Sequence, residues 1–383
     1  MKVALVTNSI DLQKEFEQSS FFNEVTIPSD DNVCDTDILI ICDDKVPYTS
    51  LISYFDKMQR RPNHVFYVIS QINDNTLFDN INVICKSQSI TIIPPGLTSK
   101  QVLLKVLYTI FPNLDKERNK VITFFGADSK VGTTMIAQSV AEMLSKRTNL
   151  KVGLLFLGGH PSKTFFKSAA AGLDNIKVKL LNKILSSHEL LGACVNQDNL
   201  YILPGNDYIL DTRHYHPDHI EYLLELASGL FDVILIDAGY NIDSGMAIAS
   251  LNSSSFKYLV TTQQTSAREN FERIASQIFT ILDIRVNEFL LLVNKYVKSN
   301  SIYTASQISE LYKIPLAAYI PHLELLGWQA EYDKKTLLAY NHHEYNSQIE
   351  LICKQLAAKF NIKLIEETEQ KKSLLHKLFK FGG

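Results

Sequence analysis

Apolar runs of strand length alternate with stretches of helical periodicity through residues 1–112. In order, the strand and helix signals are KVALVT, DLQKEFEQ, EVTIP, DILIIC, LISYFDKM, HVFYVIS, INVIC, ITIIP and SKQVLLKVLYTIF. Strands that alternate with helical stretches are typical of a parallel sheet covered by helices. The pattern therefore predicts an α/β domain over 1–112.

A second and longer α/β series begins at Val121. Residues 121–125 form an apolar run, 126–132 a loop of small and polar residues, and 133–143 a stretch with helical spacing. Further strand-like runs lie at 151–157, 200–206, 231–241, 256–262 and 289–295. We expect a larger α/β domain over 121–362.

The chain is too long for one ordinary hydrophobic core, since it has 383 residues. The charged stretch NLDKERNK at 113–120 is the expected linker between the two domains. Residues 363–383 follow the last core-like helix as a polar tether and a short basic segment. The prediction is therefore two α/β domains, a linker and a tail.

Composition narrows the class of protein. A hydrophobic content of 46% and a charged content of 21% are those of a globular chain. The net charge of −3 gives no argument for nucleic-acid binding, and no specific nucleic acid is predicted. No apolar run approaches the roughly 20 residues of a membrane span, and no signal peptide opens the chain. These features predict a cytoplasmic protein.

The five cysteines show no C-x-x-C spacing that would indicate a metal site. They are interpreted as buried free thiols in a reducing cytoplasm. They are Cys34, Cys42, Cys85, Cys194 and Cys353.

The loop at 126–132 has the chemistry of a phosphate-binding site. It joins a strand to a helix that opens on Thr133 and Thr134, so backbone N–H groups and the helix dipole favour an anion there. The Walker pattern G-x-x-x-x-G-K-[ST] is partly met, because Thr133 occupies the lysine position. The candidate nucleotide-binding residues here are Gly126, Ser129, Lys130, Val131, Gly132, Thr133 and Thr134.

An acidic residue ends a later apolar strand, FDVILIDAGYN at 231–241. Asp237 would lie at the carboxyl end of this strand, where open α/β sheets bind ligands. Together with the Thr134 hydroxyl it is the candidate magnesium site.

The loop resembles the variant P-loop of the MinD/ParA ATPase family, K-G-G-x-G-K-T-T, in the register 128–135. In that register Asp128 occupies the signature lysine, Ser129 and Lys130 the two glycines, and Thr133 the P-loop lysine. The resemblance extends over about 120–360 in the order and spacing of strands. It implies ATP or ADP with Mg²⁺ as the ligand.

Two further segments are compared with the family pattern. The family has an acidic D-x-D-P after its second strand, whereas residues 156–161 read FLGGHP. His160 there either takes over a polar role or is an ordinary loop histidine. Asn294 and Lys295 resemble the N-K/R pair that meets adenine in the family; the alternative is that Asn294 caps a strand end.

Hydrolysis is expected to be slow or absent. In the family, two lysines and Mg²⁺ stabilise the negative charge that develops on the γ-phosphoryl group. Here the two positions hold Thr133 and Asp128, and a carboxylate near phosphates is repulsive. Lys130 is the candidate replacement cation. No residue is assigned a catalytic role, and the expectation is nucleotide binding with weak or no ATPase activity.

The first domain resembles a response-regulator receiver, which has a flavodoxin-like parallel sheet. Asp43 and Pro47 stand where receivers have the phosphoacceptor and its proline. The acidic pair is replaced by Thr7 and Asn8, and the lysine by Pro94. Without these groups a phosphoryl group has no cation to neutralise it. The interpretation is a degenerate receiver that serves for docking or dimerisation; the alternative is a working phosphorelay.

The tail KKSLLHKLFKFGG has an apolar face opposed by basic residues. This composition is typical of a helix that lies in a membrane interface. The tail also resembles the C-terminal membrane-targeting helix of MinD. Its candidate membrane-binding residues are Leu374, Leu375, Lys377, Leu378, Phe379, Lys380 and Phe381.

A receiver-like domain before an atypical MinD-type domain resembles the TadZ/CpaE proteins, which position pilus machinery. The resemblance implies a homodimeric scaffold at the inner face of the cell membrane that recruits the components of a pilus or secretion system. The alternative is an active ATPase that cycles on the membrane for division-site selection or cargo partitioning, with partners from a division machinery.

Overall fold

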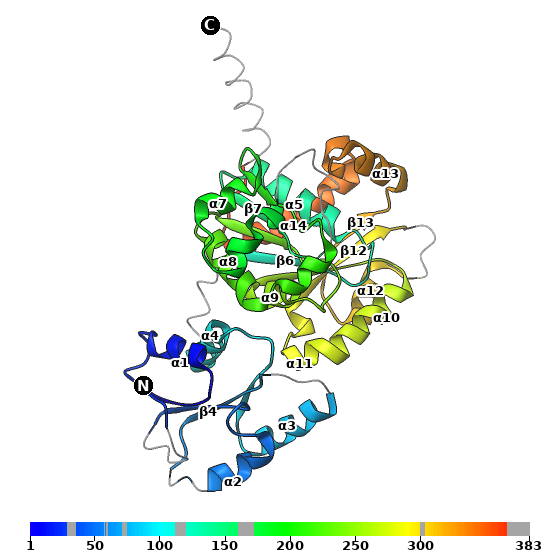
Figure 1. Cartoon of the computed structure of the whole chain (residues 1–383). Helices are drawn as coiled ribbons and strands as arrows, with labels where there is room; N and C mark the ends of the chain where they lie inside the picture. Colours follow the sequence, from blue (N-terminus) through cyan, green and yellow to red (C-terminus); the bar gives the residue numbers. More distant parts are fainter. Residues whose placement is uncertain are drawn as a thin grey trace. The chain divides into compact units, whose positions relative to one another are not determined.

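The computed structural model describes residues 1–28, 36–56, 58, 60–70, 75–111, 120–159, 172–298 and 303–365. The chain divides into two compact units, each with its own sheet (Figure 1). One unit comprises Met1–Arg118 and Ala275–Ile284, and the other Asn119–Ile274 and Arg285–Gly383.

The N-terminal unit contains a five-stranded sheet in the order β2-β1-β3-β4-β5, with every pairing parallel. This is the strand order of flavodoxin-like doubly wound sheets. The strands are β1 (Lys2–Val6), β2 (Glu24–Thr26), β3 (Ile38–Cys42), β4 (His64–Val68) and β5 (Thr91–Ile93). The helices are α1 (Ile10–Glu17), α2 (Leu51–Asp56), α3 (Asn75–Ser87) and α4 (Ser99–Ile110).

Helices cover both faces of this sheet. Alternate residues of β1 and β3 form one core with Phe16 of α1 and Val106 of α4. The residues between them form a second core with Leu51 of α2 and Ile81 of α3. Burial on both faces explains why the strands read as continuous apolar runs, such as Ile38–Cys42.

The segment Ala275–Ile284 groups with the N-terminal unit. It contains the π-helix Ala275–Phe279 and the short α11 (Thr280–Leu282). Ile281 packs against the second core, and Lys105 of α4 forms an ion pair with Asp283. A piece of chain distant in sequence thus completes this unit.

The larger unit contains an eight-stranded sheet in the order β13-β12-β11-β6-β10-β7-β9-β8. Every pairing is parallel except that of β8 with β9. The strands are β6 (Val121–Gly126), β7 (Val152–Phe156), β8 (Val195–Gln197), β9 (Leu200–Leu203), β10 (Val233–Asp237), β11 (Phe256–Thr261), β12 (Phe289–Tyr296) and β13 (Leu316–Pro321).

Strand β6 is the first strand of this sheet in sequence and lies between β11 and β10. Later strands are added on both of its sides, so the strand order reverses there. Open α/β sheets bind ligands at the carboxyl ends of strands at such a switch point. The loop after β6 therefore lies where this fold class places its ligand.

Helices flank the larger sheet, and α14 packs along α5. The Ser139 and Tyr345 hydroxyls, both buried, hydrogen-bond between these two helices at 2.7 Å. The helices are α5 (Thr133–Arg147), α6 (Gly172–Leu181), α7 (Ser187–Gly192), α8 (Pro217–Ser228), α9 (Gly245–Ser253), α10 (Thr265–Ile274), α12 (Ala305–Tyr312), α13 (Glu324–Asp333) and α14 (His343–Phe360).

The described cysteines agree with the expectation of free thiols. Cys42, Cys85 and Cys353 are buried and Cys194 is half-buried, all without a disulfide. Burial raises the pKa of Cys42 to about 12 and that of Cys85 to about 11, so both thiols stay protonated at neutral pH. Within the described ranges, no helix is long and apolar enough to cross a membrane.

Candidate functional site

The loop between β6 and α5 has a backbone that favours glycine at two positions. Gly132 has a φ of 94° and Lys130 a φ of 57°, both in the left-handed region. From Gly132 the chain enters α5, whose first N–H groups have no partner within the helix. The loop and the helix N-terminus therefore present N–H groups of the kind that bind phosphate.

Side chains approach both loop glycines closely. A Cβ at Gly132 would lie 2.2 Å from Asn294 Nδ2, and one at Gly126 would lie 2.7 Å from Thr133 Oγ1. Real Cβ atoms do not approach other atoms so closely, and Gly132 also has a positive φ. The backbone conformation therefore favours glycine at 132, whereas a side chain at 126 would require Thr133 to move.

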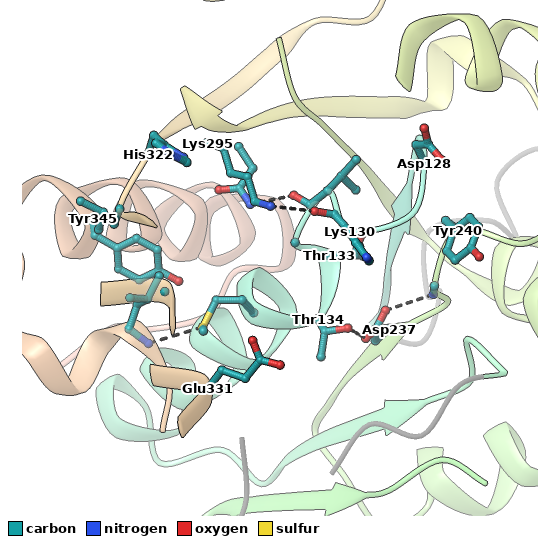
Figure 2. Close-up of a pocket in the computed structure, with 18 of the residues that line it drawn as sticks. Asp128, Lys130, Thr133, Thr134, Asp237, Tyr240, Lys295, His322, Glu331 and Tyr345 are labelled. Carbon is teal, nitrogen blue, oxygen red and sulfur yellow. Dashed lines mark hydrogen bonds between the residues drawn. The ribbon is translucent and has the colours of Figure 1, made fainter. Parts of the chain in front are cut away.

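The candidate magnesium residues meet beneath this loop (Figure 2). The Thr134 hydroxyl donates to Asp237 Oδ2 at 2.6 Å, and the Gly239 N–H donates to Asp237 Oδ1 at 3.0 Å. They meet because β6 and β10 are adjacent parallel strands: Asp237 is the last residue of β10, and Thr134 lies in the first turn of the helix after β6. Asp237 is only 4% exposed, so its carboxylate is held at a fixed position.

These two oxygen donors fit a magnesium ion that also binds phosphate. Mg²⁺ is usually held by one or two carboxylates together with phosphate oxygens and waters, not by a protein cage. The described residues contain no group of three or more His, Cys, Asp or Glu side chains that could hold a metal. A site built from one hydroxyl and one carboxylate therefore needs the oxygens of a ligand to complete it.

Asn294 and Lys295 hold the loop in place. The pairing of β12 with β13 is irregular between Val293 and Tyr296, and Lys295 has a φ of 52°. Such an irregularity redirects side chains at a strand end. Asn294 Nδ2 donates to the Val131 carbonyl at 2.7 Å, and Lys295 Nζ donates to the Lys130 carbonyl at 2.9 Å (Figure 2). Both side chains thus contact loop carbonyls, a role that neither sequence interpretation included.

A cleft of about 720 Å³ lies over the loop. This volume is within the range of small-molecule and cofactor sites. In Figure 2, His322, Glu331 and Tyr345 lie across the cleft from Asp237 and Tyr240. The predicted residues that line it are Lys130, Val131, Gly132, Thr133, Thr134, Asp237, Asn294 and Lys295.

Gly126 and Ser129 belong to the same loop but are not among the residues that line the cleft. The predicted membrane-binding residues, 374–381, lie outside the described part of the chain. His160 lies outside it as well.

Several lining residues were not found by sequence reasoning. Tyr240 follows Asp237 closely in sequence, and that position was the only signal for it. Four more come from the segments after β13, where no motif marks them; they are His322, Trp328, Glu331 and Tyr345.

The charge around the cleft is mixed. Lys130 and Lys295 line it, but so do Asp128, Asp237 and Glu331. Asp128 Oδ1 accepts a hydrogen bond from the Ser129 N–H at 2.6 Å, and the Lys295 amine is bonded to the loop. Among the described lining residues, Lys130 is therefore the lysine available to approach a phosphate group.

The turn after β7 is packed too tightly to carry an acidic side chain at Gly158. A Cβ there would lie 2.6 Å from the Gly239 nitrogen and 2.7 Å from its Cα. Gly239 itself has a φ of 65°, and a Cβ on it would lie 2.9 Å from Gly158 Cα. Two glycine turns thus touch beside Asp237, and a side chain at Gly158 would have to displace the backbone of Gly239.

The carboxylates at the edge of the N-terminal sheet are bonded within the chain. Asp43 accepts from the Ser70 hydroxyl at 2.5 Å and from the Ser70 N–H at 2.9 Å. Asp44 accepts from the Thr7 hydroxyl at 3.1 Å and from the Asn8 N–H at 3.0 Å. Of the two side chains that replace the acidic pair, Thr7 donates to the Asp44 carboxylate and Asn8 Nδ2 donates to the Asp44 backbone carbonyl at 3.0 Å. Both are uncharged hydrogen-bond donors.

Comparisons with known proteins identify the fold of the larger unit. No protein-family model matches the sequence, and no curated protein is similar to it in sequence. A ParA family ATPase from Chlorobium tepidum superposes with a TM-score of 0.54 at 17% identity, over 61% of this chain and 98% of that one. The cell division ATPase MinD of Pyrococcus furiosus gives 0.52 at 16% identity, over 63% and 99%.

A third similar structure contains a nucleotide. The septum site-determining protein MinD of Pyrococcus horikoshii, solved with Mg-ADP, gives a TM-score of 0.51 at 15% identity, over 62% of this chain and 95% of that one. At such identities the likeness shows the fold alone. The structures similar to the larger unit are P-loop ATPases of the ParA/MinD family.

Proposed function

We propose that this protein is a nucleotide-binding scaffold at the membrane surface, with weak or no ATPase activity. The observation that carries the proposal is the Thr134–Asp237 pair, 2.6 Å apart beneath the loop N–H groups. This pair supplies the protein ligands for Mg²⁺, and the cleft above it has room for a nucleotide. Bound ATP or ADP would supply the remaining oxygen ligands of the metal.

Binding and hydrolysis place different demands on this site. Binding uses the loop N–H groups and the helix dipole, which are present, and a metal ion, which Thr134 and Asp237 can hold. Hydrolysis requires additional positive charge where the transition state becomes more negative. Thr133 cannot supply it, and Lys295 is bonded to the loop. A side chain at Gly158 would meet the backbone of Gly239, so this position carries no acid to position water.

A second candidate function, a cycling ATPase, is favoured by one observation. Lys130 lines the cleft from the loop itself and carries a mobile ammonium group. If that group reaches the γ-phosphoryl oxygens, it replaces the missing lysine. The protein would then switch on the membrane with its nucleotide state, as for division-site selection or cargo partitioning.

The N-terminal unit is proposed as a degenerate receiver that serves for docking or dimerisation. Its parallel sheet in the order β2-β1-β3-β4-β5 and the position of Asp43 support this assignment. The hydrogen bonds of Asp43 to Ser70 leave that carboxylate engaged with the chain. A receiver-like unit before a ParA/MinD-type unit favours a role like that of the TadZ/CpaE proteins, which localise pilus machinery.

Membrane attachment is proposed for the basic amphipathic tail at 371–381. One short helix binds weakly, whereas two tails on a homodimer bind with a much higher effective affinity. Dimerisation would therefore control how long the protein stays at the inner face of the membrane and recruits its protein partners.

Calorimetric titration of the purified protein with ATP and with ADP, each with Mg²⁺, tests the nucleotide site. We expect binding without measurable phosphate release from the same samples. Turnover at the rate of an active ParA/MinD ATPase would replace the proposal by the cycling enzyme, and K130A would then have to abolish it. Absence of binding would leave the larger unit with the fold of these ATPases but without their ligand.

A further inference from the structure

Helix α13 presents an apolar face to solvent. Leu325, Trp328 and Tyr332 are exposed by 75%, 62% and 85%, although large apolar side chains are usually covered. Their spacing of three and four residues places them on one face of the helix. A continuous stripe of this kind indicates a surface that another element covers, whereas single exposed apolar residues do not.

The end of the described chain and the segment just after α13 both contact helix α5. Just beyond α13, the Thr336 hydroxyl donates to Glu142 of α5 at 2.5 Å. Five residues further along α5, the Arg147 carbonyl accepts a hydrogen bond from the Ile365 N–H at 2.7 Å, and Arg147 Nε donates to the Ile365 carbonyl at 2.8 Å. Five residues of α-helix rise about 8 Å, so the two contact points on α5 are separated by about that distance along the helix.

The segment beyond Ile365 complements α13 in charge and in shape. Residues 371–380 contain four lysines and no acidic residue, whereas 324–333 contain three acidic residues and no basic one. Both segments carry an apolar stripe. Two lysines follow α13 at 334 and 335, beyond its end. A helix over 371–381 would be about 16 Å long, close to the length of α13.

We propose that the tail of this chain, residues 371–381, docks on the apolar face of α13 when the protein is not on a membrane. The tether 366–370 spans up to about 16 Å when extended, about twice the separation of the two contact points on α5. Docking covers the same leucine and phenylalanine side chains that the tail would insert into lipid. The consequence for membrane release depends on the proposed membrane role of the tail, whereas the docking itself does not.

Trp328 reports on this contact, because it is the single tryptophan of the chain. Its emission and its quenching by acrylamide are compared between the full chain and a chain ending at Ile365. We expect the truncated protein to emit at longer wavelength and to be quenched more strongly, because removal of the tail exposes the indole to water. Equal emission and quenching in the two proteins would overturn the proposal.

Point variants separate docking from other effects of truncation. In the full chain, the double variant L375E/L378E should give the emission of the truncated protein, and so should L325S/Y332S, which keeps the reporter. The matched control is V178S, which removes a side chain of similar exposure, 70%, from α6 and should change nothing. A change with V178S as large as with L325S/Y332S would contradict docking on α13.

Two further outcomes would identify a different occupant and overturn the proposal. Protection of Trp328 that persists without the tail and increases with protein concentration would indicate a second copy of the chain. A blue shift of the truncated protein with vesicles of phosphatidylglycerol and phosphatidylcholine would indicate that α13 itself meets lipid. If the tail docks, the vesicles should shift only the full chain, to longer wavelength; failure of vesicle binding alone would refute the membrane role and leave docking intact.

Discussion

At the scale of single residues, the left-handed conformation of Lys130 strains the loop of the candidate site. Its φ is 57°, a region that costs a residue with a Cβ roughly 1–2 kcal/mol. We predict that K130G raises the free energy of unfolding by up to about 1 kcal/mol, with part of the gain lost to the flexible unfolded chain. Urea denaturation measures this change.

The control for that variant is K313G, because Lys313 ends α12 with a φ of 55° and is remote from the loop in sequence. It should stabilise the protein by a similar amount and leave nucleotide binding unchanged. A loss of stability in K130G would show that its side chain makes contacts worth more than the strain.

Asp237 is the residue on which the magnesium requirement depends. We predict that D237N weakens binding of Mg-ADP by about tenfold or more, a change of 1.4 kcal/mol, because a neutral amide replaces the anionic ligand of the metal. Titration of ADP with and without Mg²⁺ measures the difference. The exposed Asp243 provides the control variant D243N. Equal affinity of D237N and the parent would place the metal elsewhere.

The contact between Gly158 and Gly239 is expected to tolerate no side chain. We predict that G158A lowers the free energy of unfolding by about 1–3 kcal/mol, because its Cβ would meet the backbone of Gly239. G192A is the matched control, since a Cβ at Gly192 meets nothing within 4 Å. Thermal unfolding compares the two. G158D should likewise destabilise the protein and should not start hydrolysis; a hydrolytically active and stable G158D would contradict this view of the turn.

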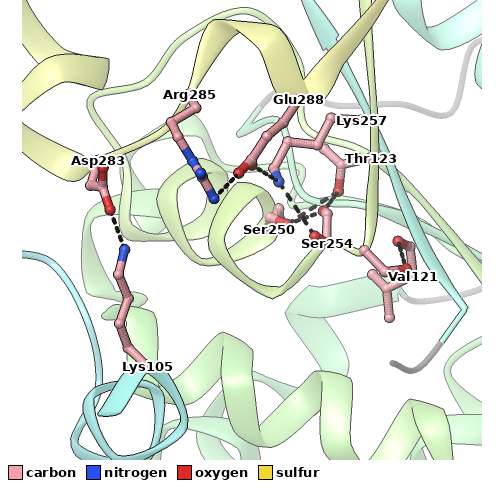
Figure 3. Close-up of polar contacts among 10 residues, drawn as sticks. Lys105, Val121, Thr123, Ser250, Ser254, Lys257, Asp283, Arg285 and Glu288 are labelled. Carbon is pink, nitrogen blue, oxygen red and sulfur yellow. Dashed lines mark hydrogen bonds and ion pairs between the residues drawn. The ribbon is translucent and has the colours of Figure 1, made fainter. Parts of the chain in front are cut away.

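At the scale of elements, an ion pair joins the start of β11 to the turn before β12 (Figure 3). Lys257 Nζ lies 2.9 Å from Glu288 Oε2, and the lysine side chain is only 8% exposed. We predict that E288A lowers the free energy of unfolding by about 2 kcal/mol, since it leaves a buried ammonium without its carboxylate. The estimate is below the range for fully buried pairs because Glu288 is 34% exposed.

Arg285 provides the internal comparison for this pair. It also contacts Glu288, at 2.7 Å, but its side chain is 69% exposed. R285A should therefore cost no more than about 0.5 kcal/mol. Chemical denaturation of both variants decides the point: similar losses in E288A and R285A would mean that burial of Lys257 does not control the strength of the pair.

At the scale of the whole molecule, attachment to membranes is predicted to reside in the tail. A chain ending at Ile365 should lose binding to anionic vesicles, because it lacks the apolar face and the lysines, each worth roughly 1 kcal/mol near such a surface. Vesicle co-sedimentation measures the loss, and added salt should weaken binding of the full chain. Retained binding by the truncated protein would show that another surface meets the lipid.

Much of the fold follows from local patterns in the sequence. Apolar runs identify the central strands, such as Ile38–Cys42 and Val233–Asp237, because strands buried on both faces must be apolar throughout. The phosphate loop could also be predicted from the sequence, because its glycines, its Thr-Thr pair and the following helix are adjacent in the chain. Thr134 and Asp237 could be paired because both follow strands of one expected parallel sheet.

Contacts between segments distant in sequence were decided only by the tertiary structure. The donation of Asn294 and Lys295 to the loop depends on an irregularity in β12 that no local pattern marks. The close approach of Gly158 and Gly239 joins two turns, and the grouping of Ala275–Ile284 with the N-terminal unit joins parts far apart in the chain.

The sequence alone thus determined the elements of this protein and the kind of chemistry in its loop, since both depend on neighbours along the chain. The tertiary structure decided which side chains complete the cleft and which apolar face stays exposed. Trp328 on α13 lines the cleft and lies on that face, and nothing in its neighbours in sequence indicates either role. The physical reason is that burial and contact are set by the packing of distant elements, which periodicity within one element does not specify.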